Sequence, residues 1–335
     1  MRKAILIGLG GMGQRYVKAL SQLNFKLVGI CDQKKDKLKK FDNIFCKKTT
    51  QYTDLLNLNA DIVCISSNTS SRENIIRDFY TKSKIKRILT EKPLTISYEK
   101  SLKILKLINK NKKKRILVNT FRSLSPNFKR IKKLFLKKKE IITHISILSP
   151  SAGLGNMGSI FFDLCNYFLE EKIISVSCQI DTTGTINPRG KIFKDPGGYG
   201  FVKYRNNKKI FFDLSENTSM PYQIILKSKN LEISIDEINN EFIVKERPNK
   251  FKKKPPYYYL YRPDKKKLVK TQKYDVIQLT KYSINELFKK KFKNNIINSI
   301  KAMEIVFGCH ASQKIEKSII FPLNKKYHKM NINFP

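Results

Sequence analysis

The sequence lacks long apolar runs. None approaches the roughly 18 consecutive apolar residues that a membrane-spanning helix needs, so we expect no membrane partner. The chain begins with two basic residues and an apolar stretch, as a signal peptide does. Gly8 ends that stretch after four residues, short of the ~7–15 of a signal segment. We therefore expect a cytoplasmic protein.

Histidine is scarce and cysteine is never closely paired. The chain has three histidines and six cysteines, and no two cysteines form a Cys-x-x-Cys pair. Zinc sites need clustered thiolate and imidazole ligands, and no such spacing occurs here. We expect no bound metal and reduced, mostly buried thiols. The cysteines are Cys31, Cys46, Cys64, Cys165, Cys178 and Cys309.

Acidic residues are outnumbered. The chain has 27 Asp and Glu against 68 Lys and Arg, a formal net charge of +41. Such a charge is typical of proteins that contact phosphates. The lysines, however, are spread along the whole chain in short runs, so we interpret them as solvated surface and expect no nucleic-acid partner. A nucleic-acid binder would need them to gather on one face of the folded chain.

A glycine motif near the start carries the clearest functional signal. Four apolar residues, read as a buried strand, lead directly into Gly8-x-Gly10-x-x-Gly13, and a helical pattern follows over 14–23. Asp32 closes a second apolar run nineteen residues later. In this context Gly8 permits a tight turn, Gly10 lets the backbone approach a pyrophosphate, and Gly13 lets helix pack on strand. Asp32 would accept hydrogen bonds from ribose hydroxyls, which favours NAD over NADP as the cofactor.

The first 120 residues alternate strand and helix patterns, and the remainder does not. This alternation predicts an α/β fold with a Rossmann doubly wound parallel sheet over 1–120. Sequential strands without intervening helices then predict an α+β domain over 121–335 with a large, mostly antiparallel open sheet. The expected strands are 3–7, 25–30, 61–66, 86–90, 115–118, 141–149, 173–183, 199–204, 209–214, 222–228, 231–236 and 241–246. The expected helices are 12–23, 70–82, 97–111, 125–138, about 158–171 and about 295–316, the last able to pack back on the first domain.

Further segments occur in a familiar order. They are Asp61-Ile-Val-Cys-Ile-Ser66-Ser67-Asn68, Glu91-Lys92-Pro93, Asn119-Thr-Phe-Arg122-Ser-Leu-Ser-Pro126, Cys309-His-Ala-Ser312 and Phe321-Pro-Leu323. Together with the glycine motif, this order resembles the Gfo/Idh/MocA family of NAD(P)-dependent oxidoreductases. The resemblance implies a dehydrogenase or reductase that acts on a sugar, cyclitol or nucleotide sugar. It also implies a homodimer or homotetramer formed through the C-terminal sheet.

The resemblance gives Lys92 the central role. The lysine of Glu-Lys-Pro lies beside the nicotinamide in that family, and Lys92 is the matching position. Oxidation of a secondary alcohol requires the hydroxyl proton to leave as the carbonyl forms, and a lysine can take that proton. In the reverse direction it can polarise the carbonyl. Pro93 would restrain Lys92 to extended conformations.

One departure from the family pattern bears on catalysis. The family commonly has Asp-x-Gly-x-His-x-x-Asp, and the histidine is its usual acid/base. The matching frame here is Asn156-Met-Gly158-Ser-Ile160-Phe-Phe-Asp163. Isoleucine cannot transfer a proton. Either Lys92 acts without that partner, or another group serves, or the chain is a cofactor-binding or regulatory protein that has lost the reaction.

The resemblance and the motifs together give the expected site residues. Lys92 is the expected catalytic residue. The expected cofactor-binding residues are Gly8, Gly10, Gly11, Met12, Gly13, Asp32, Ser66, Ser67, Asn68, Glu91 and Lys92. The expected substrate-binding residues are Arg122, Asn156, Asp163 and Asn166. Arg122 could bind a carboxylate or phosphate or cap the following helix, and Asp163 and Asn166 could reach substrate hydroxyls or serve the helix alone.

Overall fold

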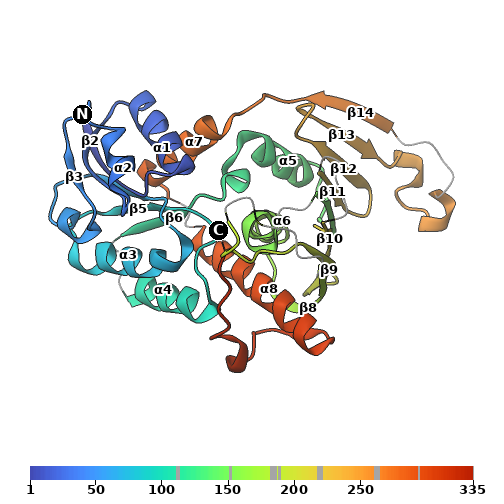
Figure 1. The fold of residues 1–335 in the computed structure, drawn as a ribbon. Coiled ribbons are helices and arrows are strands. Elements are labelled where there is room, and N and C mark those ends of the chain that lie inside the picture. The colour runs from blue at the N-terminus through green and yellow to red at the C-terminus, as the bar shows by residue number, and fades with distance from the viewer. Residues whose placement is uncertain are drawn as a thin grey trace.

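A computed structural model describes residues 1–110, 114–150, 153–181, 187, 190–216, 222–259, 265–292 and 295–334. The fold has two sheets, and helices lie between them at the centre of the molecule (Figure 1). Among the described residues, no helix combines the length and apolar character needed to cross a bilayer.

The first sheet is a six-stranded parallel sheet in the order β3-β2-β1-β4-β5-β6. Its central strands β4 and β5 and the edge strand β6 are short and almost wholly buried, as expected of parallel strands covered on both faces. The bounds are β1 Arg2–Ile7, β2 Phe25–Cys31, β3 Lys47–Thr49, β4 Ile62–Ile65, β5 Arg87–Thr90 and β6 Arg115–Val118. The order reverses between β1 and β4, which places a crevice at their carboxyl ends.

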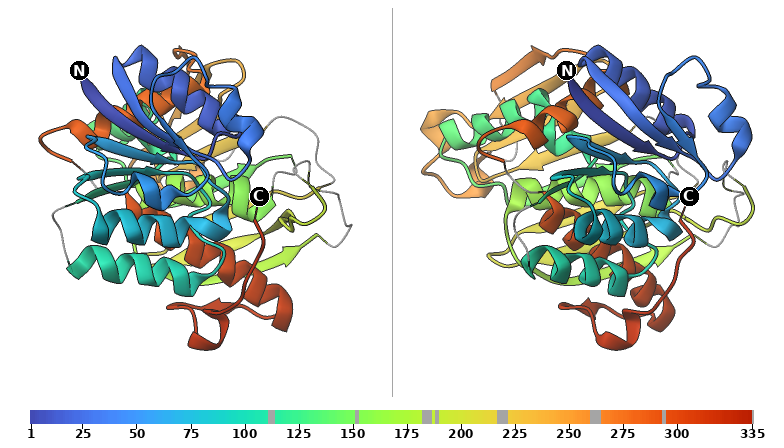
Figure 2. Two further views of the ribbon diagram at one scale, coloured as in Figure 1. Left: turned by 60° about the vertical axis from the view of Figure 1, so that its left-hand side comes forward. Right: turned by 90° about the vertical axis from the view of Figure 1, so that its left-hand side faces the viewer.

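Helices cover both faces of this sheet. One face is covered by α1 (Gly11–Gln22) and by α7 (Val276–Phe288), which comes from late in the sequence. The other face is covered by α3 (Thr69–Lys82) and α4 (Tyr98–Lys110). A short helix, α2 (Lys35–Lys39), follows β2. Figure 2 shows α3 and α4 side by side beneath the sheet.

The second sheet has nine strands in the order β14-β13-β12-β11-β7-β10-β9-β8-β15. Only the β7–β10 pair is parallel. The strands alternate buried and exposed residues, so one face packs on helices and the other stays open. The bounds are β7 His144–Leu148, β8 Ile173–Ile180, β9 Gly198–Tyr204, β10 Lys209–Asp213, β11 Gln223–Lys227, β12 Leu231–Asp236, β13 Glu241–Glu246, β14 Lys265–Lys270 and β15 Ile319–Ile320.

Three helices lie between the two sheets. They are α5 (Pro126–Lys137), α6 (Ser159–Leu169) and α8 (Ile296–Ile315). The last of these packs on α6 and β8 of the second sheet and also on α4 and β6 of the first (Figure 1). A 3-10 turn, Phe121–Leu124, leads from β6 into α5, and a π-helical turn, Gly153–Gly158, leads into α6.

The predicted fold class is confirmed: a parallel Rossmann-type sheet precedes a larger, mostly antiparallel one. Each predicted strand and helix is present within a few residues of its expected bounds. Five elements were not predicted, namely α2, α7, β3, β14 and β15. The division at 120/121 stays a prediction; α7 contacts β5 and β6 of the first sheet, and α8 contacts β6 and α4.

Candidate active site

The glycine motif forms the turn between β1 and α1. Gly8 has φ +90°, a conformation that side chains disfavour, and a Cβ there would lie 2.6 Å from the Ser66 carbonyl carbon. A Cβ on Gly13 would lie 2.1 Å from the carbonyl oxygen of Gly8. Gly11, by contrast, faces open space. The outer part of the turn is therefore accessible to a ligand, and its inner part is tightly packed.

Asp32 lies directly beneath this turn. Its Oδ2 accepts a hydrogen bond from the Leu9 backbone N–H at 2.8 Å, and its Oδ1 accepts one from the Lys34 N–H at 3.0 Å. The Lys37 ammonium is 3.4 Å from Oδ2. An ionised carboxylate has about four lone-pair sites, so Asp32 can hold the turn and still accept from a further hydroxyl.

The segment after β4 lies against the glycine turn. The Ser66 hydroxyl donates to the Gly8 carbonyl at 2.7 Å. Ser67 is partly exposed and Asn68 is exposed, at the start of α3. Arg72, which the sequence analysis did not select, is buried on α3 and donates to the Ser67 carbonyl at 2.8 and 3.1 Å. Its Nη1 also donates to the Pro93 carbonyl, so Arg72 joins the two segments that border the crevice.

Glu91 is buried inside the protein. Its Oε1 accepts from the Tyr16 hydroxyl and from the Asn119 amide, each at 2.7 Å. Burial and the neighbouring carboxylate raise the pKa of the Tyr16 hydroxyl, which keeps its donor proton in place. The Ser283 hydroxyl of α7 donates to Asn119 Oδ1 at 2.7 Å. Glu91 thereby braces α1, β6 and α7 around the end of β5.

Lys92 follows β5 of the first sheet and contacts the π-helical turn that precedes α6. Its Nζ donates to the backbone carbonyl of Asn156 at 3.2 Å and also to the Asn156 side-chain Oδ1. Asn156 lies on the π-helical turn before α6, and both side chains are partly exposed. The Lys92–Pro93 peptide bond is cis. The structure thus brings together Lys92 and Asn156, which the sequence places 64 residues apart.

A second residue outside the sequence prediction supports this contact. Both carboxylate oxygens of Asp195 accept backbone N–H groups of the π-helical turn, from Gly155 at 2.6 Å and from Asn156 at 2.7 Å. Charge-assisted hydrogen bonds of this length are strong. Asp195 therefore fixes the turn that carries Asn156. Nothing in its sequence neighbourhood distinguishes it from any other loop aspartate.

Asp163 and Asn166 are enclosed by protein. The Ser123 and Ser299 hydroxyls donate to the Asp163 carboxylate at 3.0 and 2.7 Å. Burial raises the pKa of that carboxyl to about 6 despite these hydrogen bonds. The Asn166 amide contacts Tyr204 and the Asn298 carbonyl. Both side chains tie α6 to its neighbours, and Ile160 is buried on the same helix.

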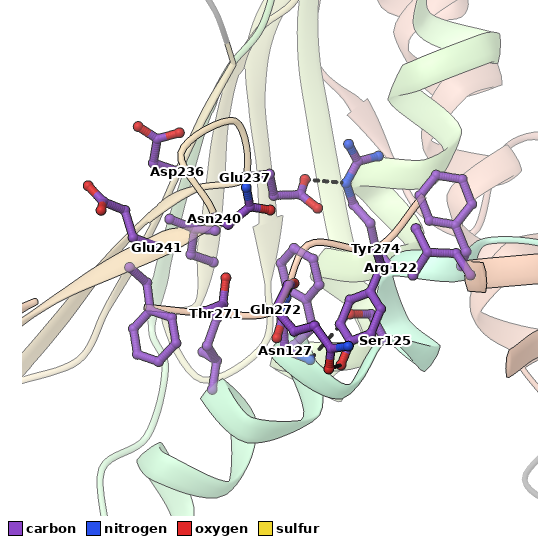
Figure 3. A pocket seen from close by; sticks show the side chains of 16 residues that line it. Arg122, Ser125, Asn127, Asp236, Glu237, Asn240, Glu241, Thr271, Gln272 and Tyr274 are labelled. Carbon is purple, nitrogen blue, oxygen red and sulfur yellow. Dashed lines mark hydrogen bonds and ion pairs between the residues drawn. The ribbon is translucent and has the colours of Figure 1, made fainter. Parts of the chain in front are cut away.

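Arg122 faces a different pocket (Figure 3). Its Nε donates to Glu237 on the β12–β13 turn at 2.8 Å, and the guanidinium lies over Phe161 at 4.9 Å. Burial opposes its charge, but Glu237 leaves the pKa of Arg122 raised overall. Lys92 and Asn156 are not among the described residues that line this pocket. The other lining residues come from the 3-10 turn, α5, the ends of β12 and β13 with the turn between them, the segment 271–274 and α7.

These contacts fit a dinucleotide at the carboxyl ends of β1 and β4. The exposed glycine turn opens a helix with no acidic residue in its first turn, which suits a pyrophosphate. Asp32 lies at the end of β2 with acceptor capacity remaining. Lys92 lies at the end of β5, beside the second domain.

The comparisons with known proteins agree with this geometry. Residues 2–120 match a family described as "Oxidoreductase family, NAD-binding Rossmann fold". No curated protein sequence matches the chain.

Solved structures resemble nearly the whole chain. An NAD-binding oxidoreductase from Klebsiella pneumoniae has a TM-score of 0.78 at 12% identity, covering 96% of this chain and 99% of its own. An Agrobacterium radiobacter oxidoreductase in complex with NAD+, L-tartaric acid and magnesium has a TM-score of 0.76 at 12% identity over 95% and 98%. The WlbA dehydrogenase from Chromobacterium violaceum, in complex with NADH and UDP-GlcNAcA, has a TM-score of 0.72 at 15% identity over 96% of each chain.

At these identities the likeness shows the fold alone, and the family rests on the match over residues 2–120. That match confirms the predicted family and its NAD cofactor. Residues 2–120, the part of the chain that forms the first sheet and its helices, thus match the Gfo/Idh/MocA family of NAD-binding oxidoreductases.

Proposed function

We propose that this protein transfers a hydride between NAD and a CH–OH carbon of a sugar, cyclitol or nucleotide sugar. The observation that carries the proposal is the contact of Lys92 with Asn156. It holds an amine at the carboxyl edge of the Rossmann sheet, where the second domain closes the crevice. NAD, when bound, would supply the hydride-transfer chemistry, and residues of this chain would have to move the accompanying proton.

Lys92 is the proposed proton-transfer residue. When the substrate is an alcohol, its amine takes the hydroxyl proton; when the substrate is a ketone, its ammonium polarises the carbonyl. Asn156 Oδ1 orients the Lys92 Nζ. Arg72 and Asp195 act through these two residues: Arg72 holds the Pro93 carbonyl and Asp195 holds the turn of Asn156. They are therefore positioning residues.

Cofactor binding is proposed for the residues that border the crevice. The glycine turn would take the pyrophosphate and Asp32 the adenosine ribose. The other proposed residues follow β4 and β5 and border the crevice there. The proposed set is Gly8, Gly10, Gly11, Met12, Gly13, Asp32, Ser66, Ser67, Asn68, Glu91 and Lys92. Within it Glu91 acts as the internal brace described above.

For the substrate, Asn156 is the strongest of the proposed residues because it contacts Lys92 directly. Arg122 is proposed as an anion-recognition residue that would have to leave Glu237. Asp163 and Asn166 are fully engaged within the protein, so we assign them the alternative role of holding α6 in place. Sugar and nucleotide-sugar dehydrogenases among the structural neighbours support a sugar-like substrate.

One observation favours a second function. Ile160 occupies the position of the family's usual histidine and is 1% exposed. A protein with this replacement could keep the cofactor pocket and serve as a binding or regulatory protein.

The two functions are separated by a hydride-transfer assay. Purified protein is mixed with NAD+ or NADH and a panel of sugars, cyclitols, sugar acids and nucleotide sugars, and NADH absorbance is followed. We expect turnover with at least one member of the panel. Saturable NADH binding with no turnover on any member would contradict the enzyme proposal and favour the regulatory one.

Asp32 gives a test of cofactor choice. Hydrogen bonds to charged groups contribute about 1.5–3 kcal/mol, so Asp32→Ala should weaken NADH binding about 10- to 100-fold by calorimetric titration. NADPH binding should weaken less or improve, because a carboxylate repels a 2′-phosphate and Lys34 and Lys37 lie close by. Asp32→Asn is the matched control, since it keeps an acceptor for the Leu9 N–H. An unchanged NADH affinity in Asp32→Ala would exclude the ribose contact.

We further propose a homo-oligomer through the open face of the second sheet. The strand registers place Phe201, Phe211, Ser146, Ile225, Ser234, Ile243 and Leu268 in one row across it. Phe211 and Leu268 are 45% and 52% exposed, and a row of this kind is typical of a subunit contact. Sedimentation equilibrium should give a dimer or tetramer; a monomer at micromolar concentration would contradict this assignment.

A further inference from the structure

Two arginines at the opposite end of the Rossmann sheet have no assigned role. Arg2 begins β1 and Arg87 begins β5. Both guanidiniums lie 4.3 Å from the ring centroid of Phe288, the last residue of α7. Stacking on an aromatic ring orders a guanidinium but leaves its in-plane N–H donors available. Across the described residues, neither guanidinium forms an ion pair or donates a hydrogen bond, and the buried Arg87 Nε has no partner.

A third arginine nearby already has hydrogen-bond partners. Arg115 begins β6, pairs with Arg87 in the sheet register, and donates to the Leu287 and Lys289 carbonyls at 2.9 and 2.6 Å. These carbonyls lie at the negative end of the α7 dipole, which suits a cation. Burial and the neighbouring Arg115 lower the pKa of Arg87, and the Asp61 carboxylate opposes this shift only in part. Like charges are thus held together at this edge, and an anion would relieve the repulsion.

The fold gathers lysines around these arginines. Strands of a parallel sheet all begin at the same edge, so residues distant in sequence line up there. The exposed lysines at this edge are Lys3, Lys26, Lys86, Lys289 and Lys290. Asp61 is the acid at the start of β4, and its Oδ2 already accepts from the Lys3 N–H at 2.7 Å. We name Arg2, Arg87, Arg115 and these five lysines the arginine edge.

We propose that the arginine edge binds the phosphate backbone of a nucleic acid, with Arg2 and Arg87 as the primary phosphate contacts. Guanidinium groups match phosphate oxygens in a bidentate geometry. The arginine edge extends across five adjacent strands, from β2 to β6. At ~4.8 Å between neighbouring strands it is roughly 19 Å long. That length suits a linear polyanion better than a single phosphate. A membrane surface suits it less, because Met1 is the one large exposed apolar side chain among the described residues of these strand starts.

This surface is separate from the proposed active site, because it lies at the amino ends of strands whose carboxyl ends border the crevice. The inference also explains why the even spread of lysines along the chain did not reveal it. Positions 2, 87 and 115 become neighbours only in the folded chain, where β1, β5 and β6 lie in one sheet and α7 packs on it. From the sequence we expected no nucleic-acid partner, and we now propose one.

The experiment is a titration of a short fluorescein-labelled oligothymidylate with the full chain, followed by anisotropy over a series of salt concentrations. We expect dissociation constants of roughly 10⁻⁶–10⁻⁴ M. The double variant Arg2→Gln/Arg87→Gln should bind at least five-fold more weakly. Its slope of log affinity against log salt should fall in magnitude by about 1.4, since each lost phosphate contact removes ~0.7 on single strands.

A matched control removes the same charge elsewhere. Lys137 and Lys267 are exposed in a second basic groove, between α5 and the β13–β14 edge. Lys137→Gln/Lys267→Gln should bind within two-fold of the unmodified chain. A second test variant, Arg2→Gln/Lys86→Gln, changes only exposed side chains and should weaken binding without risk to the fold. NADH titration of every variant should be unchanged, which separates this surface from the proposed enzymatic function.

Three results would overturn the proposal. The first is no oligonucleotide binding by the unmodified chain at low salt. The second is equal weakening by the control, which would mean that the charge acts diffusely. The third is binding to phosphatidylserine vesicles that Arg2→Gln/Arg87→Gln abolishes while oligonucleotide binding persists, which would make the edge a membrane contact.

Discussion

Replacement of Lys92 by alanine should lower turnover by about 10²–10⁴-fold, the usual contribution of a positioned proton-transfer group. The amine is the titratable group that the structure holds against Asn156 between the two domains. Ile160 leaves no histidine at the usual position to share the work. The measurement is steady-state kinetics on whichever substrate the panel identifies, together with the NADH dissociation constant by calorimetry.

A second variant separates chemistry from packing. Lys92→Met keeps a long side chain without the amine, so it should be as inactive as Lys92→Ala. Both should bind NADH within about three-fold of the unmodified chain, because the glycine turn and Asp32 are untouched. Lys86 is an exposed lysine directly before β5, the strand that Lys92 follows. Lys86→Ala is therefore the control and should keep full activity. Full turnover by Lys92→Met would remove Lys92 from the mechanism.

The other large effect is expected at the glycine turn. A Cβ on Gly13 would lie 2.1 Å from the Gly8 carbonyl oxygen, which is backbone and cannot rotate away. Gly13→Ala should therefore displace α1 from β1, weaken NADH binding at least about 100-fold and destabilise the fold by about 1–3 kcal/mol, as overpacking does. Calorimetric titration and thermal unfolding measure the two effects.

Gly11→Ala is the matched control for the loss of stability. Its Cβ would meet nothing within 4 Å, and the residue begins α1, where alanine is favourable. The thermal midpoint should be unchanged or higher. Equal losses of thermal stability in both variants would show that the turn is sensitive to any side chain, against the packing argument.

The sequence predicted elements whose signal is local. Apolar runs such as Ile62–Ile65 are buried on both faces and are strands in the fold. β14 was missed because Lys265–Lys270 reads as a charge run with low strand propensity. In the fold it pairs with β13, where Glu241 lies opposite Lys270 and Glu246 lies opposite Lys265. α7 was also missed, although its sequence carries a helical signal: Asp275 caps the first turn, and Leu279, Ser283 and Leu287 share a buried face.

The same distinction applies to the site. Lys92 and the glycine turn belong to short motifs with fixed spacing, so the sequence and the family resemblance were enough to propose them. Arg72 and Asp195 act through carbonyl and amide groups of segments far away in the chain. Roles of this kind depend on tertiary contacts and are not encoded in any local pattern.

The edge strand β6 affects how the chain folds during its synthesis. Asn295 Oδ1 accepts from the Val118 N–H at 3.1 Å and its amide donates to the Val118 carbonyl at 2.9 Å, which imitates a neighbouring strand. α7 and Asn295 are made long after β6, about 175 residues later. At ~5–20 residues per second, a ribosome needs roughly 10–35 s to supply them. During that interval the nascent Rossmann sheet has an open edge and an uncovered face, so the cofactor domain must wait for the rest of the chain before it can fold to completion.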